Sequence, residues 1–117
     1  MGFDQHVEES QAQQFCKSRF QSEFLRAKTI EKTMNGFLFS GKDPIHVIVQ
    51  DSIITFDNQI SGELTTYDAA IEYMEIEVQE NLVKTLKLYI LQANQKTIQW
   101  TFHKEYDQFT LLENSLQ

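Results

Sequence analysis

The sequence has few of the residues that build disulfides, metal sites or membrane spans. It contains one cysteine, one proline and four glycines in 117 residues. A single cysteine, Cys16, excludes an intrachain disulfide, and with three scattered histidines it gives no zinc-ligand spacing. No window of about 18 consecutive apolar residues is present, and the N-terminus lacks the basic and apolar stretches of a secretory signal. We therefore predict no structural zinc and no membrane span within these residues.

Positive charge is also scarce. Ten Lys and Arg residues face seventeen Asp and Glu residues, which gives a formal net charge of −7. Nucleic acid is held mainly by clustered Lys and Arg, and the basic clusters of this chain are short. The composition therefore predicts no direct, tight nucleic-acid binding. A chain of this length can bury a core without disulfides or metal, so we expect a single domain over residues 1–117.

The apolar residues of the N-terminal third follow a helical period. From Asp4 to Met34 they fall within about half of a helix circumference, which predicts one amphipathic helix. They are Ala12, Phe15, Cys16, Phe20, Phe24, Ala27, Ile30 and Met34. Ser10 and Gln13 form a capping box, and Asn35-Gly36 is typical of a C-cap. The predicted helix spans about residues 4–35, and its N-terminal third projects beyond the rest of the chain.

Two charged residues, Arg19 and Glu23, interrupt this apolar stripe one turn apart. Their spacing is that of an i,i+4 ion pair. The simpler interpretation is a solvent-facing, incidental pair, because exposed pairs contribute little. The alternative is that the helix packs against another helix in an assembly, where the pair sets the register. The candidate residues for helix packing or an interface are Phe15, Arg19, Phe20, Glu23 and Phe24.

After Gly36 the pattern changes to the alternation of β-strands. The expected strands are 37–39, 45–49, 53–56, a short stretch over 60–66, 69–78 with a bulge near Tyr73, and a hairpin of 86–90 with 98–102. Phe109, Leu111 and Leu112 predict a last short strand or a docked tail. The predicted fold is α+β, a long N-terminal amphipathic helix packed on an antiparallel β-sheet meander over about residues 37–112.

No residue pattern identifies a catalytic or metal site. Glu72, Glu75, Glu77 and Glu80 form the densest charge cluster, but no loop with calcium spacing accompanies them. A solvated strand face that resists aggregation is the expected role of this cluster.

Three other side chains are candidates for chemistry. His46 and His103 are possible general bases, but the chain has no GxSxG, P-loop, HExxH or GxGxxG motif. Cys16 lies on the apolar stripe, which predicts a buried, inert thiol. We therefore expect no enzyme activity, no catalytic residue, no cofactor and no metal.

The order of helix, hairpins and acidic strand resembles the soluble domain of a minor pseudopilin, a type IV pilin-like protein of the Gram-positive competence machinery. The similar stretches are 14–34, 45–57 and 70–102. The resemblance implies a non-enzymatic subunit that supports a transformation pilus for DNA uptake and packs with other pilin-like subunits through its N-terminal helix. Family members begin with a prepilin-peptidase site and an apolar membrane-spanning helix. The resemblance therefore implies such a segment in place of Met1-Gly2, and a membrane-associated, cell-surface location.

Two other functional classes stay open, both cytoplasmic. The first is a small cystatin-like or NTF2-like cone that binds a small ligand or acts as an enzyme. It would place His46 or His103 with a carboxylate in a deep pocket. The second is a peptide-binding adaptor, which would use an exposed, unpaired sheet edge.

Overall fold

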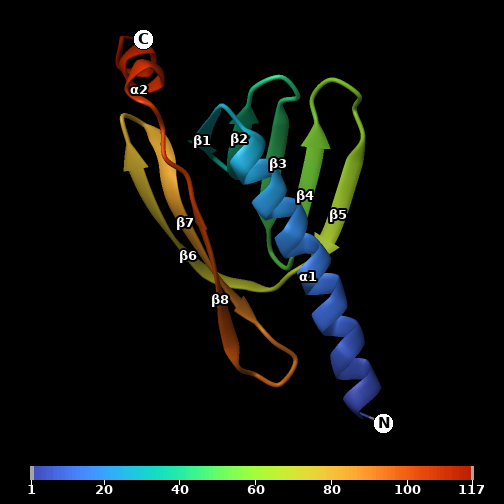
Figure 1. Cartoon of the computed structure of the whole chain (residues 1–117). Coiled ribbons are helices and arrows are strands. Elements are labelled where there is room, and N and C mark those ends of the chain that lie inside the picture. The colour runs from blue at the N-terminus through green and yellow to red at the C-terminus, as the bar shows by residue number, and fades with distance from the viewer. Residues whose placement is uncertain (1, 117) are drawn as a thin grey trace.

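The computed structural model describes residues 2–116, with side chains described from Gln11 onward. These residues form helix α1 (Gly2–Arg26), eight strands and a short helix α2 (Gln108–Ser115), as Figure 1 shows. The strands are β1 (Thr29–Thr33), β2 (Gly36–Ser40), β3 (Ile45–Gln50), β4 (Ile53–Asn58), β5 (Leu64–Asp68), β6 (Ile71–Gln79), β7 (Leu82–Leu91) and β8 (Thr97–His103).

The strands form two antiparallel sheets instead of one. The first sheet has the order β1-β2-β3-β4-β5, and the second has the order β6-β7-β8. The predicted fold, a helix on a single sheet meander, is therefore wrong. The chain changes sheet at Ala69 and Ala70, where the Ala69 N–H donates to the Ser52 carbonyl and the Leu91 N–H donates to the Ala70 carbonyl. Strand alternation indicates a buried face but not which strands pair, so it could not reveal this break.

Helix α1 packs against both sheets through two phenylalanines. The Phe20 ring stacks on Phe102 of β8 at 4.8 Å between centroids and meets Phe39 of β2 edge-on at 5.7 Å. Phe24 contacts the same two rings. In Figure 1, α1 runs across the first sheet with the second sheet beside it. The core therefore lies where the helix and the two sheets meet, and Phe20 is at its centre.

The predicted helix is too long by about nine residues, since α1 ends at Arg26 and β1 follows. Residues 29–33 include two threonines and an isoleucine, which are β-branched and favour a strand. Asn35-Gly36, expected as a helix C-cap, instead lies at the β1–β2 turn, where Thr33 pairs with Gly36. The two central residues of this turn are Met34 and Asn35. As a consequence Met34, expected on the buried stripe, is fully exposed.

The C-terminal segment is a helix instead of the predicted last strand or docked tail. Asp107 caps α2, because its carboxylate accepts a hydrogen bond from the Thr110 N–H at 2.7 Å. A side-chain cap of this kind satisfies one of the free N–H groups at a helix start. The same bond lowers the pKa of the Asp107 carboxyl below its usual value. Asn114 donates to the Glu80 carbonyl and so fastens α2 to the β6–β7 turn.

Other parts of the strand prediction are confirmed. The β7–β8 hairpin is present, with Leu88 opposite Trp100 and Ile90 opposite Ile98. Strand β6 carries a register shift between Ile71 and Tyr73, which is the expected bulge. Among the described residues, the side chain of Tyr106 links the two sheets by hydrogen bonds. Its hydroxyl donates to the Val83 carbonyl of β7 at 2.6 Å and accepts from the Ile30 N–H of β1 at 3.2 Å.

Candidate functional site

The inward side of α1 is part of the core. Cys16, Phe20, Phe24 and Ala27 are buried. Burial raises the pKa of the Cys16 thiol to about 12, so the thiol stays protonated at neutral pH. A protonated, buried thiol is neither a nucleophile nor a metal ligand. The prediction that Cys16 is a buried thiol is confirmed.

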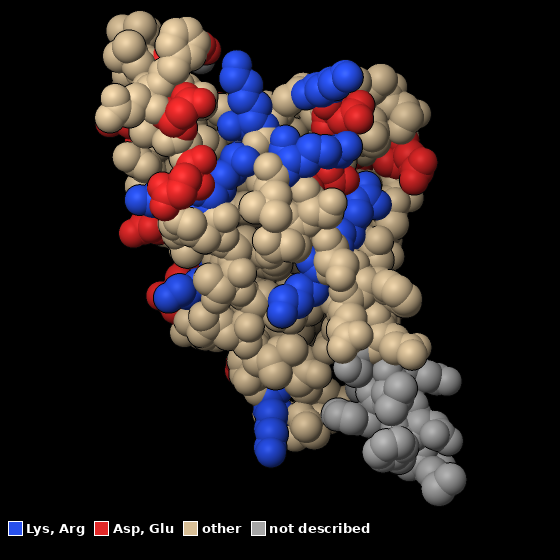
Figure 2. Space-filling model, viewed as in Figure 1, with Lys and Arg blue, Asp and Glu red and all other residues tan. Residues whose placement is uncertain are grey.

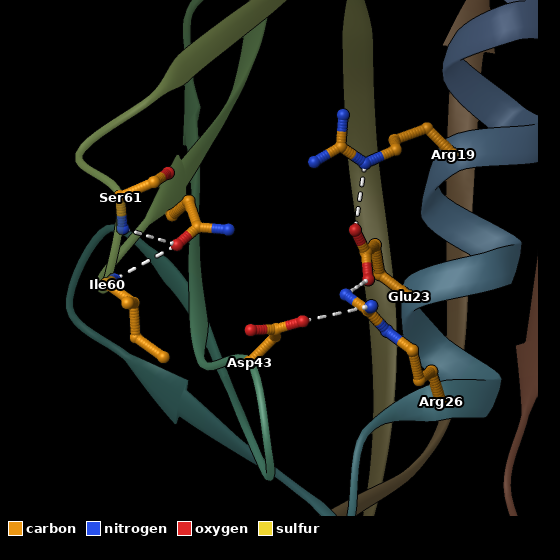
Figure 3. Close-up of polar contacts among 7 residues, drawn as sticks. Arg19, Glu23, Arg26, Asp43, Ile60 and Ser61 are labelled. Atoms are coloured by element: carbon orange, nitrogen blue, oxygen red, sulfur yellow. Dashed lines mark hydrogen bonds and ion pairs between the residues drawn. The ribbon is translucent and has the colours of Figure 1, made fainter.

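The Arg19–Glu23 pair exists, but Glu23 does not face solvent. Its carboxylate accepts a hydrogen bond from Arg19 Nε at 2.9 Å and a second hydrogen bond from Arg26. Arg26 also forms an ion pair with the Asp43 carboxylate at 3.5 Å, as Figure 3 shows. The Glu23 residue is only 6% exposed. The Arg19 guanidinium also lies over the Phe56 ring at 4.9 Å. The interpretation of a solvent-facing pair is therefore wrong, and the pair belongs to a network that joins α1 to the β2–β3 turn.

Phe15 lies outside the core, although the sequence pattern placed it on the apolar stripe. It is 67% exposed, and each described side chain from 11 to 15 is exposed or half-buried. Cys16 is the first buried residue among the described side chains of α1. Phe15 lies at the edge of the predicted stripe, about 100° around the helix from Cys16, and so points toward the flank of the helix. Among the side chains described from Gln11 onward, the part of α1 that the sheets cover therefore begins at Cys16.

The exposed side of the described part of α1, from Gln11 to its end and on to Lys28, is cationic. Between Gln11 and Lys28 the basic residues are Lys17, Arg19, Arg26 and Lys28, and the only carboxylate is the buried Glu23. Figure 2 shows Lys and Arg side chains along the line of α1 on the viewed face. In a chain with a net charge of −7, this face has the opposite sign to the molecule as a whole. Leu25, on the same side, is exposed.

The two candidate histidines lie on different sheets. His46 of β3 has its Nε2 3.2 Å from the Thr33 hydroxyl. His103 ends β8, with Nδ1 2.9 Å from the Thr85 hydroxyl and Nε2 2.6 Å from Glu105. The latter bond lowers the pKa of the Glu105 carboxyl. Hydrogen bonds thus join the side chains of Thr85, His103 and Glu105 at the protein surface.

A surface hollow of about 520 Å³ lies beside α1 at the end where the chain changes sheet. It is lined by Ala12, Gln13, Ser52, Ile53, Asp68, Ala69, Ala70, Leu91 and Ala93. Among the described residues that line it, Asp68 is the one ionisable group, and neither His46 nor His103 contributes to it. The hollow therefore lacks the histidine and carboxylate pair that the cone hypothesis requires.

The acidic strand β6 presents carboxylates on the exposed face of the second sheet. Glu72 accepts from the Thr97 hydroxyl at 2.6 Å, Glu77 accepts from the Thr85 hydroxyl at 3.1 Å, and Glu75 accepts from the Tyr89 hydroxyl. The glutamates are exposed, as expected of a solvated strand face. Within the described side chains, no group of three or more His, Cys, Asp and Glu residues is arranged to hold a metal.

Sequence reasoning missed two features. One is Tyr106, which no local pattern singles out. The other is an apolar stripe on α2 formed by Phe109, Leu112 and Leu116, all exposed. The spacing i, i+3, i+7 after an Asp cap could have indicated this helix.

No helix within the described residues is long and apolar enough to span a membrane. No family model matches the chain, and no curated protein or solved structure matches it either.

Proposed function

We propose that this chain is the soluble domain of a non-enzymatic assembly subunit, a minor pseudopilin that supports a transformation pilus for DNA uptake. Its partners are other pilin-like subunits, which it meets through the N-terminal part of α1. The domain itself does not hold DNA tightly. Membrane attachment and a cell-surface location come from a segment outside residues 1–117.

The distribution of burial along α1 supports this proposal. The C-terminal half of the helix is covered by two sheets, whereas the side chains from 11 to 15 are not. Phe15, on the uncovered part, exposes most of its ring. A large exposed aromatic on an uncovered helix is typical of a surface that a partner buries. A neighbouring helix in a filament is such a partner.

The charged network supports the same assignment. Glu23 is held by two arginines, and Asp43 holds one of them in turn. These contacts, with Phe20 and Phe24, fasten the C-terminal half of α1 firmly to the sheets. The helix is thus fixed through its C-terminal half, while the side chains of residues 11–15 stay available to a neighbouring subunit. The proposal depends on this helix and not on the number of sheets.

The test is DNA uptake in the organism that encodes the chain. Deletion of the gene should reduce transformation to background, and the wild-type gene should restore it. Complementation with Phe15→Asp should lower transformation about tenfold or more, because a buried interface aromatic contributes at least roughly 1.4 kcal/mol. The matched control is Ile60→Asp, which changes an equally exposed apolar residue on the β4–β5 turn.

Two results would contradict the proposal. Unchanged transformation in the deletion strain would exclude a role in DNA uptake. Equal activity of Phe15→Asp and Ile60→Asp, with both proteins folded by circular dichroism, would exclude the helix contact.

A further inference from the structure

Helix α2 exposes an apolar stripe that the rest of the chain leaves uncovered. Phe109, Leu112 and Leu116 are 70%, 58% and 79% exposed. They lie on one side of the helix, because their spacing is i, i+3, i+7. The opposite side carries the buried Thr110 and the anchored Asn114. The stripe therefore faces away from the molecule.

The charge of this region has one sign. Residues 105–116 contain Glu105, Asp107 and Glu113, and they contain no Lys or Arg. Glu113 lies next to the apolar stripe on the helix, and Asp107 lies at its start. A surface that buries this stripe must therefore tolerate or complement negative charge.

The outer face of α1, formed by Ser18, Ser22, Leu25, Arg26 and Lys28, has the complementary properties. These residues are all exposed. Ser18 and Ser22 are small, so another helix can approach closely between them, and Leu25 offers an apolar contact beside them. Lys28, just after the end of α1, supplies positive charge at this end, and Lys104 lies nearby through its bond to the Leu25 carbonyl at 3.0 Å. The Arg26 charge is already paired with Glu23 and Asp43.

We infer that α2 of one molecule docks on the outer α1 face of a second copy. The two faces belong to different molecules because the Asn114 bond holds α2 at the β6–β7 turn, and Figure 1 shows α2 projecting away from α1. Each copy then offers one α2 and one outer α1 face. Such a head-to-tail contact is heterologous, so it builds a closed ring or an open chain according to the rotation between copies.

This contact goes beyond the proposed contact at Phe15, which lies one turn earlier on the same exposed side of α1. It is weak in solution, because one short helix buries less than the roughly 1,200 Å² of a stable complex. In a filament, neighbouring copies supply the effective concentration that such a contact needs. Salt weakens it, because opposite charges contribute.

The test is sedimentation velocity on the purified chain up to about 1 mM, a range suited to an interface of this size. The wild type should associate with rising concentration, and the dissociation constant should rise about tenfold between low and high salt. Leu25→Asp with Lys28→Glu should be monomeric, and so should Phe109→Ser with Leu112→Ser. Ile60→Ser, at an exposed turn, is the matched control and should associate like the wild type.

A mixture of the two monomeric variants decides the geometry. Each retains the face that the other has lost, so together they should form a 1:1 complex and nothing larger. Should either variant fail to fold, Glu113→Lys and Lys28→Glu replace them. Each should weaken association alone, and the mixture should recover it. A wild type that stays monomeric throughout, α2 variants that associate normally, or a mixture that stays monomeric would each overturn the inference. None of these results bears on transformation by Phe15→Asp, so the two proposals fail separately.

Discussion

At the scale of single residues, identical residue types on one helix have opposite roles. Phe15 and Phe20 are both on the predicted apolar stripe, but Phe20 is enclosed by rings from both sheets and Phe15 is mostly exposed. The difference is a matter of which part of α1 the sheets cover. Burial, and not residue type, therefore separates the core residue from the candidate interface residue.

Gly36 is a residue whose missing side chain is required. A Cβ at this position would lie 1.8 Å from the Val47 carbonyl oxygen, because β2 and β3 approach closely there. Gly36→Ala should therefore destabilise the protein by at least about 2 kcal/mol, since the backbone of two strands must shift. Urea unfolding followed by circular dichroism measures this change. Met34→Ala, at the exposed turn two residues earlier, should stay within about 0.5 kcal/mol of wild type. A Gly36→Ala protein as stable as Met34→Ala would refute the close approach.

At the scale of elements, the attachment of α1 depends on a carboxylate with two arginine partners. Arg19→Met with Arg26→Met leaves Glu23 buried without a cation. An uncompensated buried charge costs about 3 kcal/mol or more, so this double variant should be markedly less stable. Adding Glu23→Met should recover most of the loss, because an apolar replacement of the whole network removes the desolvation penalty. Chemical denaturation of the three proteins measures both steps. A triple variant no more stable than the double variant would exclude this account.

At the same scale, the prediction of elements succeeded where periodicity was unambiguous. The β7–β8 hairpin and the bulge in β6 follow from alternation along each strand. The end of α1 did not, because Ala27, Ile30 and Met34 also fit a helical spacing. Pairing with β2 across a two-residue turn makes residues 29–33 a strand, and the spacing of the apolar residues does not reveal that pairing. Helix α2 was missed because three apolar residues in a short segment fit either element.

At the scale of the whole molecule, Tyr106 joins the two sheets. Burial raises the pKa of its phenol to about 12, above the ordinary value of about 10. The folded state therefore favours the protonated phenol. The stabilisation that the protonated Tyr106 contributes is complete below about pH 10 and is lost as the pH rises from about 10 to about 12. Unfolding free energies measured from pH 8 to pH 12 should fall in this window.

Tyr106→Phe separates this effect from that of other groups. The variant loses both hydrogen bonds and leaves the Ile30 N–H and the Val83 carbonyl unpaired, at a cost of about 1–3 kcal/mol near pH 8. Its loss of stability between pH 10 and pH 12 should be smaller than that of wild type. The pKa of Tyr89 is also raised, by its bond to Glu75. Tyr89 is present in both proteins, so its effect on the pH dependence cancels when the two profiles are compared. Parallel pH profiles for the two proteins would contradict the role of Tyr106.

The sequence by itself determined the local properties of this chain. It indicated an N-terminal helix, alternating strands, a buried thiol at Cys16 and the Arg19–Glu23 pair, because each of these depends on neighbours within a few residues. Only the tertiary structure decided that the strands divide into two sheets at Ala69 and Ala70, that Glu23 is buried and that Phe15 is exposed. The physical reason is that periodicity records which side of an element is apolar, whereas the element that covers this side is selected by contacts between distant parts of the chain.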